Sequence, residues 1–65
     1  MRVTKRQAQV LDALCEHGHN KLIARALGVE PKAVEAVISR VKTRTGIDSR
    51  VVLAVRWDRY KRSIG

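Results

Sequence analysis

The fold is decided by residues 30–46, which read Glu30-Pro31-Lys32-Ala33-Val34-Glu35-Ala36-Val37-Ile38-Ser39-Arg40-Val41-Lys42-Thr43-Arg44-Thr45-Gly46. Glu30 can cap the start of a helix with its carboxylate, and Pro31 fits the first helical turn, where no amide partner is needed. Gly46 suits the position just past the end. The residues that recur at helical spacing, and that we expect to face a core, are Val34, Ile38, Val41 and Thr45. The stretch therefore predicts one helix over residues 31–45.

The opposite side of this predicted helix is small and basic. It carries Lys32, Ala33, Ala36, Ser39, Arg40 and Thr43, with Lys42 and Arg44 beside them. A helix with such a side can lie close to a large polyanion, and the major groove of B-DNA is wide enough to admit one helix. The alternative is a solvated amphipathic helix whose small residues have no function, and this stretch alone does not decide between the two.

Length and composition point to a small basic domain. The chain has 65 residues, a net charge of +8 and 45% hydrophobic residues, and its pI is near 10.9. A chain of this length is one domain at most, and its apolar content is too high for a disordered basic tail. An acidic polymer is therefore the first partner to consider.

The sequence contains no signal for secretion, membrane insertion or catalysis. Cys15 cannot form an internal disulfide, no apolar run is long enough to span a membrane, and residues 1–6 lack the apolar core of a signal peptide. Cys15, His17 and His19 match no common zinc pattern, so we expect no metal, and Cys15 is expected to be a partly buried packing residue. We also expect no cofactor, no small-molecule ligand and no enzymatic activity, in a reduced, cytoplasmic protein.

Two shorter helices precede the central one. Thr4 followed by Gln7 forms a weak capping box before a helix over about residues 5–16, which stops at Gly18. A second helix over residues 20–27 ends at Gly28. In the first helix, Gln7, Val10, Leu11 and Leu14 repeat with helical period, and in the second the expected apolar stripe is Leu22, Ile23, Ala26 and Leu27. The connection Gly28-Val29-Glu30 then makes a helix-turn-helix of the second and third helices.

A fourth helix is predicted over about residues 49–61, capped by Asp48 or Ser49. Its core side is expected to hold Leu53, Ala54, Trp57 and Tyr60, whereas Val51, Val52 and Val55 lie on another side. A helix that faces one core needs a single apolar stripe, so we interpret the valines as a dimer surface. The alternative is that all three valines are partly buried against the third helix. The sequence thus predicts an all-α domain of four helices over residues 1–65.

Several segments, taken in order, carry a resemblance to a known family. They are Val3-Thr4-Lys5-Arg6-Gln7-Ala8-Gln9-Val10-Leu11, Asn20-Lys21-Leu22-Ile23-Ala24 with Leu27-Gly28-Val29, Ala33-Val34-Glu35, and Gly46-Ile47-Asp48-Ser49-Arg50 followed by Ala54. They resemble, respectively, the L-T-x-R-E-x-E-V-L, N-K-E-I-A-x-x-L-G-I, T-V-K and G-V-x-x-R segments of the LuxR/GerE-type DNA-binding domains of bacterial regulators. The resemblance covers about Val3 to Trp57, and a start at Met1 without a linker favours a free-standing domain.

The resemblance implies that the third helix enters the DNA major groove and that the fourth pairs two copies. By position, Glu35, Ala36 and Ser39 fall where family members direct side chains at bases, and Lys21 and Ala33 fall where they hold phosphates. Together with the small, basic side of the helix, this gives a base-facing set of Lys32, Glu35, Ala36, Ser39, Arg40 and Thr43. The set that contacts the phosphate backbone is Lys21, Ala33, Lys42, Arg44 and Arg50, with the dimer formed by Val51, Val52 and Val55.

The chain departs from the family pattern at positions that matter for base recognition. Glu35 stands where the family has Lys, Ala33 where it has Thr, and Val37 where His is frequent. His19 and Leu22 replace the usual capping pair of the second helix. An acid in the groove is repelled by phosphates, although it can accept a hydrogen bond from cytosine N4. We therefore expect a changed target sequence or weaker specificity.

The first hypothesis is a small DNA-binding transcriptional regulator, nucleoid-associated and acting as a homodimer on double-stranded DNA. The second is a protein-interaction module that uses the same fold to bind a component of the transcription machinery. A domain like region 4 of sigma factors is a third possibility, but residues 46–54 fit the LuxR type better. Charge reversal at Arg40 and Arg44 distinguishes the first hypothesis from the second, since only DNA binding depends on these cations.

Overall fold

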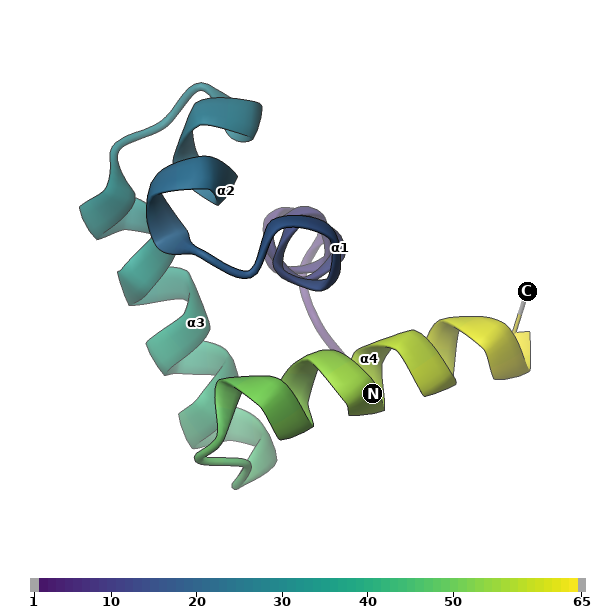
Figure 1. The fold of residues 1–65 in the computed structure, drawn as a ribbon. Helices are drawn as coiled ribbons and strands as arrows, with labels where there is room; N and C mark the ends of the chain where they lie inside the picture. The colour runs from purple at the N-terminus through teal and green to yellow at the C-terminus, as the bar shows by residue number, and fades with distance from the viewer. Residues whose placement is uncertain (1, 65) are drawn as a thin grey trace.

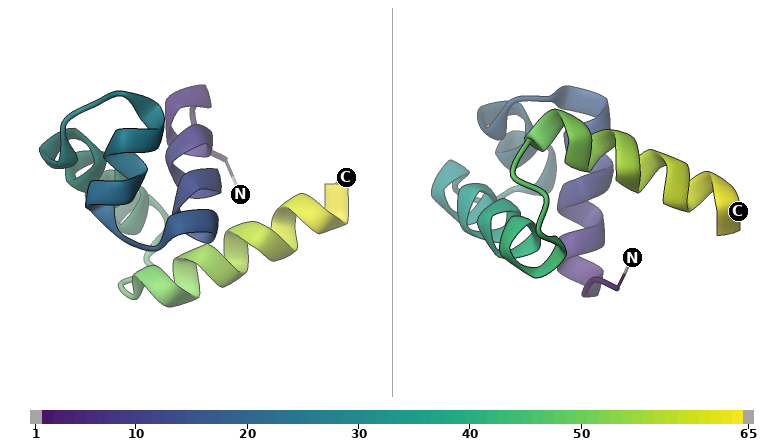
Figure 2. Two further views of the ribbon diagram at one scale, coloured as in Figure 1. Left: turned by 45° about the horizontal axis from the view of Figure 1, so that its top comes forward. Right: turned by 90° about the horizontal axis from the view of Figure 1, so that it is seen from below.

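The computed structural model describes residues 2–64 and contains four α-helices in this range (Figure 1). They are α1 (Lys5–His17), α2 (Asn20–Leu27), α3 (Pro31–Thr45) and α4 (Arg50–Ile64). α1 lies in the middle and packs against each of the other three, as the views in Figures 1 and 2 agree. The predicted all-α fold of four helices is confirmed.

The ends of the first three helices follow from local chemistry. The Thr4 hydroxyl accepts a hydrogen bond from the Gln7 amide at 3.1 Å, and the Thr4 amide donates to Gln7 Oε1 at 3.0 Å, which completes the predicted capping box. α1 runs one residue further than predicted, to His17. α3 ends at Thr45 and is capped by Gly46, whose φ of 75° is the left-handed conformation that glycine adopts without strain. The bounds of α2 and α3 are as predicted.

The turn between α2 and α3 is Gly28-Val29-Glu30. Gly28 has a φ of 68°, and the Val29 amide donates to the Ala24 carbonyl at 3.0 Å, so the chain reverses within these residues. Val29 is partly buried and packs against the core. This tight turn fixes the direction of α3 relative to α2 and makes the pair a helix-turn-helix.

The prediction that Glu30 caps α3 with its carboxylate is wrong. Glu30 occupies the cap position, but its side chain makes no capping hydrogen bond. The glutamate side chain is one methylene longer than that of the favoured Asp, and its carboxylate does not return to the first turn. Pro31 does begin the helix as predicted, and the Glu30 carbonyl accepts from the amides of Ala33 and Val34.

One hydrophobic core joins the four helices. Its buried residues are Val10, Leu11, Ala13, Leu14, Ile23, Ala24, Val34, Ile38, Val41, Leu53 and Trp57. The stripe predicted for α2 is partly wrong, because Leu22 and Ala26 are exposed and Ala24 is buried in their place. Leu22 and Ala26 lie four residues apart on one side of α2, and α2 turns its other side toward α1 and α3. Apolarity alone did not distinguish the two sides.

α4 differs most from its predicted bounds, since it begins at Arg50 and continues to Ile64. Ser49 caps its start by accepting from the Val52 amide at 3.2 Å. No glycine or proline interrupts residues 61–64, and an Arg62–Asp58 ion pair of 3.0 Å supports the added turn. Leu53 and Trp57 are buried as predicted, with Ala54 and Tyr60 partly buried beside them. The Trp57 and Tyr60 rings stack with centroids 5.5 Å apart.

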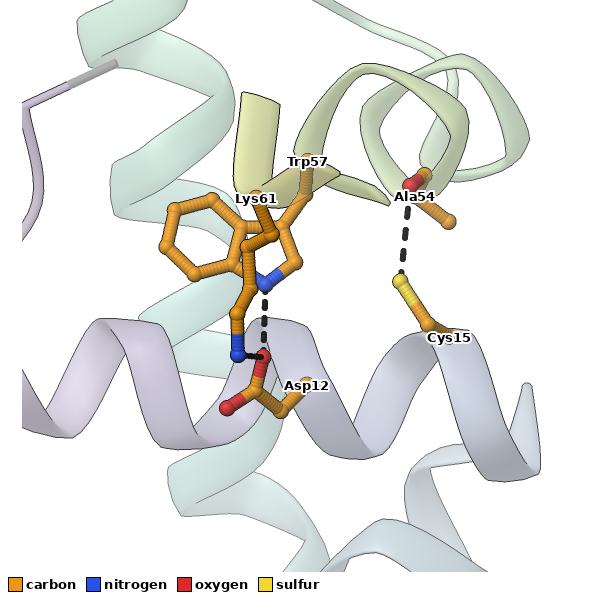
Figure 3. A network of polar contacts seen from close by, with 5 residues as sticks. All are labelled: Asp12, Cys15, Ala54, Trp57 and Lys61. Atoms are coloured by element: carbon orange, nitrogen blue, oxygen red, sulfur yellow. Dashed lines mark hydrogen bonds and ion pairs between the residues drawn. The ribbon is translucent and has the colours of Figure 1, made fainter. Parts of the chain in front are cut away.

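A polar network holds α4 to the middle of α1 (Figure 3). Trp57 Nε1 donates to Asp12 Oδ1 at 2.8 Å, and Lys61 Nζ donates to the same oxygen at 3.0 Å. Because the Trp57 ring is buried, its indole N–H needs a protein acceptor, and Asp12 supplies it. The network thus fixes where α4 crosses α1.

The network also sets the pKa of Asp12. Burial raises this pKa, but the hydrogen bonds from Trp57 and Lys61 and the charge of Lys61 together outweigh burial and bring it below the ordinary value of 3.8. A carboxyl group whose pKa is lower in the folded state stabilises the fold above its unfolded pKa. This contribution is lost as the pH falls through the folded-state pKa.

Cys15 is exposed, which corrects the expectation of a partly buried residue. It lies near the end of α1, beside the point where α4 crosses, and its Sγ donates to the Ala54 carbonyl at 3.4 Å (Figure 3). The side chain is exposed on one side only, and its partial desolvation beside α4, followed by the charges of Asp58 and Asp12, raises the pKa of the thiol above the ordinary value of 9.0. Cys15 therefore stays protonated and weakly reactive near neutral pH.

We predict that Asp12→Ala lowers the free energy of unfolding by about 1–3 kcal/mol, because it leaves the buried indole N–H of Trp57 without an acceptor. Asp12→Asn keeps an oxygen for Trp57 and should cost less. Urea denaturation followed by tryptophan fluorescence measures both values. The gap between wild type and Asp12→Asn should close as the pH falls through the folded-state pKa of Asp12, which lies below 3.8, since protonation then removes the same charge.

Asp58→Ala is the matched control. It also removes one carboxylate, but from the exposed ion pair of Asp58 with Arg62, which lies entirely within α4. It should change the free energy of unfolding by at most about 0.5 kcal/mol. Equal losses from Asp12→Ala and Asp58→Ala would show that the Asp12 network does not hold α4.

Candidate nucleic-acid interface

The outer side of α3 is a line of short, exposed side chains. Lys32, Ala36, Ser39 and Thr43 are all exposed and follow one another at intervals of four, three and four residues. This spacing places them along one side of a helix, opposite the buried stripe of Val34, Ile38 and Val41. We call these four residues the crest of α3. Ala, Ser and Thr are short, so a partner can approach the helix backbone closely along the crest.

One flank of the crest faces the starts of α2 and α4. A polar hollow there is lined by Asn20, Glu35, Ile38, Ser39, Lys42 and Arg50. We call it the α4-side hollow. It brings together four residues that were predicted to bind DNA, namely Glu35, Ser39 and Lys42 of α3 and Arg50 of α4. Asn20 was not predicted, although it opens the N-K segment that resembles the family.

The other flank of the crest faces the start of α1. Thr4 and Gln7 of the capping box line a second hollow together with Ser39, Arg40, Thr43 and Arg44, and we call it the α1-side hollow. Arg40 and Arg44 therefore lie on this flank and beside the crest. Next to it, Arg6 and Ala33 border a small apolar hollow with Val10, Val29, Val34 and Val37. The start of α1 was missed as part of this surface because its residues are distant from α3 in sequence.

The cations around α3 have no acidic partners in the part of the chain that the structure describes. The ion pairs recorded for residues 2–64 are Lys61–Asp12, which joins α4 to α1, and Arg62–Asp58, which lies within α4. Neither involves a residue of α3. Lys32, Arg40, Lys42 and Arg44 stand on α3 against one carboxylate, that of Glu35. The charge on this face is thus available to an external anion.

Arg50 and Asn20 of the α4-side hollow differ in their hydrogen bonding, since Arg50 has a protein partner and Asn20 Oδ1 has none among the described residues. Arg50 Nη2 donates to the Gly18 carbonyl at 3.0 Å, so this guanidinium ties α4 to the loop before α2 while its other donors remain. Asn20 Oδ1 is buried and has no hydrogen-bond partner among the described residues. Lys21, predicted to contact phosphate, is exposed on the first turn of α2, and it does not line this hollow.

The valines that were predicted to form the dimer lie in the first two turns of α4. Val51, Val52 and Val55 are 70%, 43% and 52% exposed, so most of Val51 and about half of each of the other two side chains are open to a partner. Val55 lies beside Cys15, Ala54 and Asp58, which line a shallow hollow where α4 crosses α1. None of the three valines lines either of the hollows beside the crest.

Within residues 2–64, no group of three or more His, Cys, Asp or Glu side chains comes together in a way that could hold a metal ion. His17 is partly buried and His19 is exposed, on either side of the loop that joins α1 and α2. None of the described helices is both long enough and apolar enough to cross a membrane.

The fold and the face of α3 define a class of protein, the four-helix helix-turn-helix domain with a cationic third helix. A comparison with known families matches residues 1–57 to the bacterial regulatory proteins of the luxR family, the GerE domain. The chain therefore belongs to the LuxR family of bacterial regulatory proteins. Searches of curated proteins and of solved structures gave no match.

Membership in this family indicates a DNA-binding helix-turn-helix domain that acts in transcription regulation. The family is not one of enzymes. The resemblance that the sequence carries, from Val3 to Trp57, is thus confirmed over nearly the same residues.

Proposed function

We propose that this protein regulates transcription by inserting α3 into the major groove of double-stranded DNA, as a homodimer that pairs through α4. The observation that carries the proposal is the exposed crest of α3 with unpaired cations on both of its flanks. A helix that enters the major groove has base edges in front of it and a sugar-phosphate strand on each side.

The crest suits the floor of the groove. Ala36, Ser39 and Thr43 are short, so the helix can approach the base edges without a steric clash. The hydroxyls of Ser39 and Thr43 can donate or accept, and the methyl group of Ala36 can contact the methyl group of thymine. Lys32 stands at the start of the crest and Arg40 at its α1-side edge, where each can reach a guanine or a phosphate. Together with Glu35, these residues form the base-facing set.

The flanks suit the two phosphate strands. On one side are Lys42 and Arg50 of the α4-side hollow, with Lys21 on the adjoining turn of α2. On the other are Arg40 and Arg44 of the α1-side hollow, with Ala33 leaving room for the strand near the start of α3. Cations on two sides of a groove-binding helix hold the backbone and set its depth and register.

The homodimer is supported by the exposed valines of α4. Large apolar side chains that share one exposed surface lose free energy when a second copy covers them. Val51, Val52 and Val55 form such a strip, and a two-fold axis beside α4 would place the same residues of both copies in contact. The strip lines neither of the hollows beside the crest, so two paired copies can each present α3 to one half of a two-fold site.

We predict that Arg40→Glu with Arg44→Glu lowers duplex affinity by about 50-fold or more at 0.1 M salt, because each lost phosphate contact removes about one released counterion. For the wild type, contact with about five phosphates per copy should give a log–log slope of affinity against salt near −4 to −5. The double variant should have a slope that is less steep by about 2. Fluorescence anisotropy with a labelled duplex measures both.

Arg56→Glu with Arg59→Glu is the matched control, since it reverses two exposed charges on α4 and changes the net charge equally. On a duplex with a single half-site, where pairing through α4 does not contribute, it should reduce affinity much less than the α3 variant. If wild-type binding were insensitive to salt, or if reversal on α3 left it unchanged, the DNA mechanism would be wrong and a protein-interaction module would be favoured.

We predict that Val51→Glu with Val55→Glu abolishes pairing, because two like-charged strips would face each other across the two-fold axis. On a duplex with two half-sites the wild type should bind two copies cooperatively. The variant should bind each half-site independently, with single-half-site affinity within about threefold of the wild type. Gel shifts on duplexes with one and two half-sites separate the two effects.

Leu22→Glu is the control for this test, because Leu22 is also an exposed apolar residue, 41% exposed, but lies on α2. It should leave cooperativity intact. Pairing through α4 would be excluded if the valine variant bound two half-sites as cooperatively as the wild type.

A further inference from the structure

We infer that Glu35 selects cytosine in the DNA target, so that the site bound by this protein differs from one read by donor side chains alone. The inference rests on the proposed insertion of α3 into the major groove. It concerns the sole carboxylate on α3, which stands beside Ala36 of the crest and lines the α4-side hollow with Ser39.

The Glu35 carboxylate is free to accept hydrogen bonds. Its side chain is exposed, and the structure records neither an ion pair nor a side-chain hydrogen bond for it among residues 2–64. An ionised carboxylate has acceptors only. Whatever it binds must therefore present a donor.

Among the base edges of the major groove, cytosine fits this requirement best. Guanine presents the acceptors N7 and O6, and thymine presents the acceptor O4 beside its methyl group, so both repel a carboxylate. Adenine offers the N6 donor, but its N7 acceptor lies next to it and repels the second carboxylate oxygen. Cytosine offers the N4 donor without an adjacent acceptor, and Glu is a known partner for this group.

The surroundings of Glu35 offset the cost of bringing a negative charge to DNA. Lys42 and Arg50 line the same hollow, and Lys32 lies three residues before Glu35 on α3. These cations neutralise the phosphates nearest to this flank, which reduces their repulsion of the carboxylate. A carboxylate in this setting lowers the affinity for DNA of any sequence. It lowers the affinity most for sites whose base at this position lacks a donor, and this difference produces selectivity.

The test is a selection of bound duplexes from a random pool with the wild type, Glu35→Gln and Glu35→Lys. The wild type should enrich duplexes with a cytosine at one position of the site. At that position Glu35→Gln should enrich adenine and Glu35→Lys should enrich guanine, because Gln pairs with N6 and N7 of adenine and Lys donates to O6 and N7 of guanine. Direct binding to wild-type sites with and without that cytosine should differ by about 5- to 100-fold, and this difference should be lost in Glu35→Gln.

Glu16→Gln is the matched control, because it removes the same charge from an exposed site on α1 that lines neither of the hollows beside the crest. It should leave the selected sequence unchanged. Circular dichroism should show that each variant is folded, as expected for an exposed side chain.

The possible failures can be told apart. If the wild type enriched no duplex and bound none at low salt, the proposed function itself would be wrong. If the wild type enriched a motif that Glu35→Gln left unchanged at every position, DNA binding would stand and the role of Glu35 would be refuted. A uniform gain in affinity in Glu35→Gln without a change of preference would also refute it, and would assign the carboxylate to phosphate repulsion.

Discussion

The packing of Val34, Ile38 and Val41 against the core is the interaction on which the rest of the structure depends. These three side chains are at most 3% exposed, and they hold α3 with one side inward. A helix has its remaining sides fixed once one side is buried, so the crest is directed outward by the same contacts. Loss of this packing would remove both the core and the exposed surface of α3.

α1 is the helix against which the other three pack, and each helix has a different structural role. α1 contributes Val10, Leu11, Ala13 and Leu14 to the core. The Asp12 network attaches α4 to α1, and the contact of Arg50 with Gly18 attaches α4 to the loop that follows α1. α2 and the Gly28 turn set the direction of α3. Most cations of the chain lie outside these stabilising contacts, so the positive charge does not hold the fold together and remains available to an anionic partner.

The sequence predicted those features that depend on neighbouring residues. The bounds of α2 and α3, the Thr4 cap and the buried stripe of α3 all follow from periodicity and from the conformational preferences of a few residues. The resemblance of Val3 to Trp57 to the LuxR family then supplied the arrangement of helices.

Features that depend on tertiary packing could not be predicted. Leu22 and Ile23 are both apolar neighbours on a short helix, and only the position of α1 and α3 decides that Leu22 is exposed. Trp57 and Asp12 are 45 residues apart, and Arg50 and Gly18 are 32 apart, so no local pattern links them. The contributions of Thr4, Gln7 and Asn20 to the flanks of α3 likewise arise only when the helices pack.

The most direct measurement of the central claim is the change in backbone amide chemical shifts when an unlabelled duplex is added to isotope-labelled protein. The account predicts the largest changes in residues 32–44 of α3, with smaller ones at the starts of α1, α2 and α4 that border its flanks. Changes confined to the outer side of α4, with α3 unaffected, would contradict insertion of α3 into the groove.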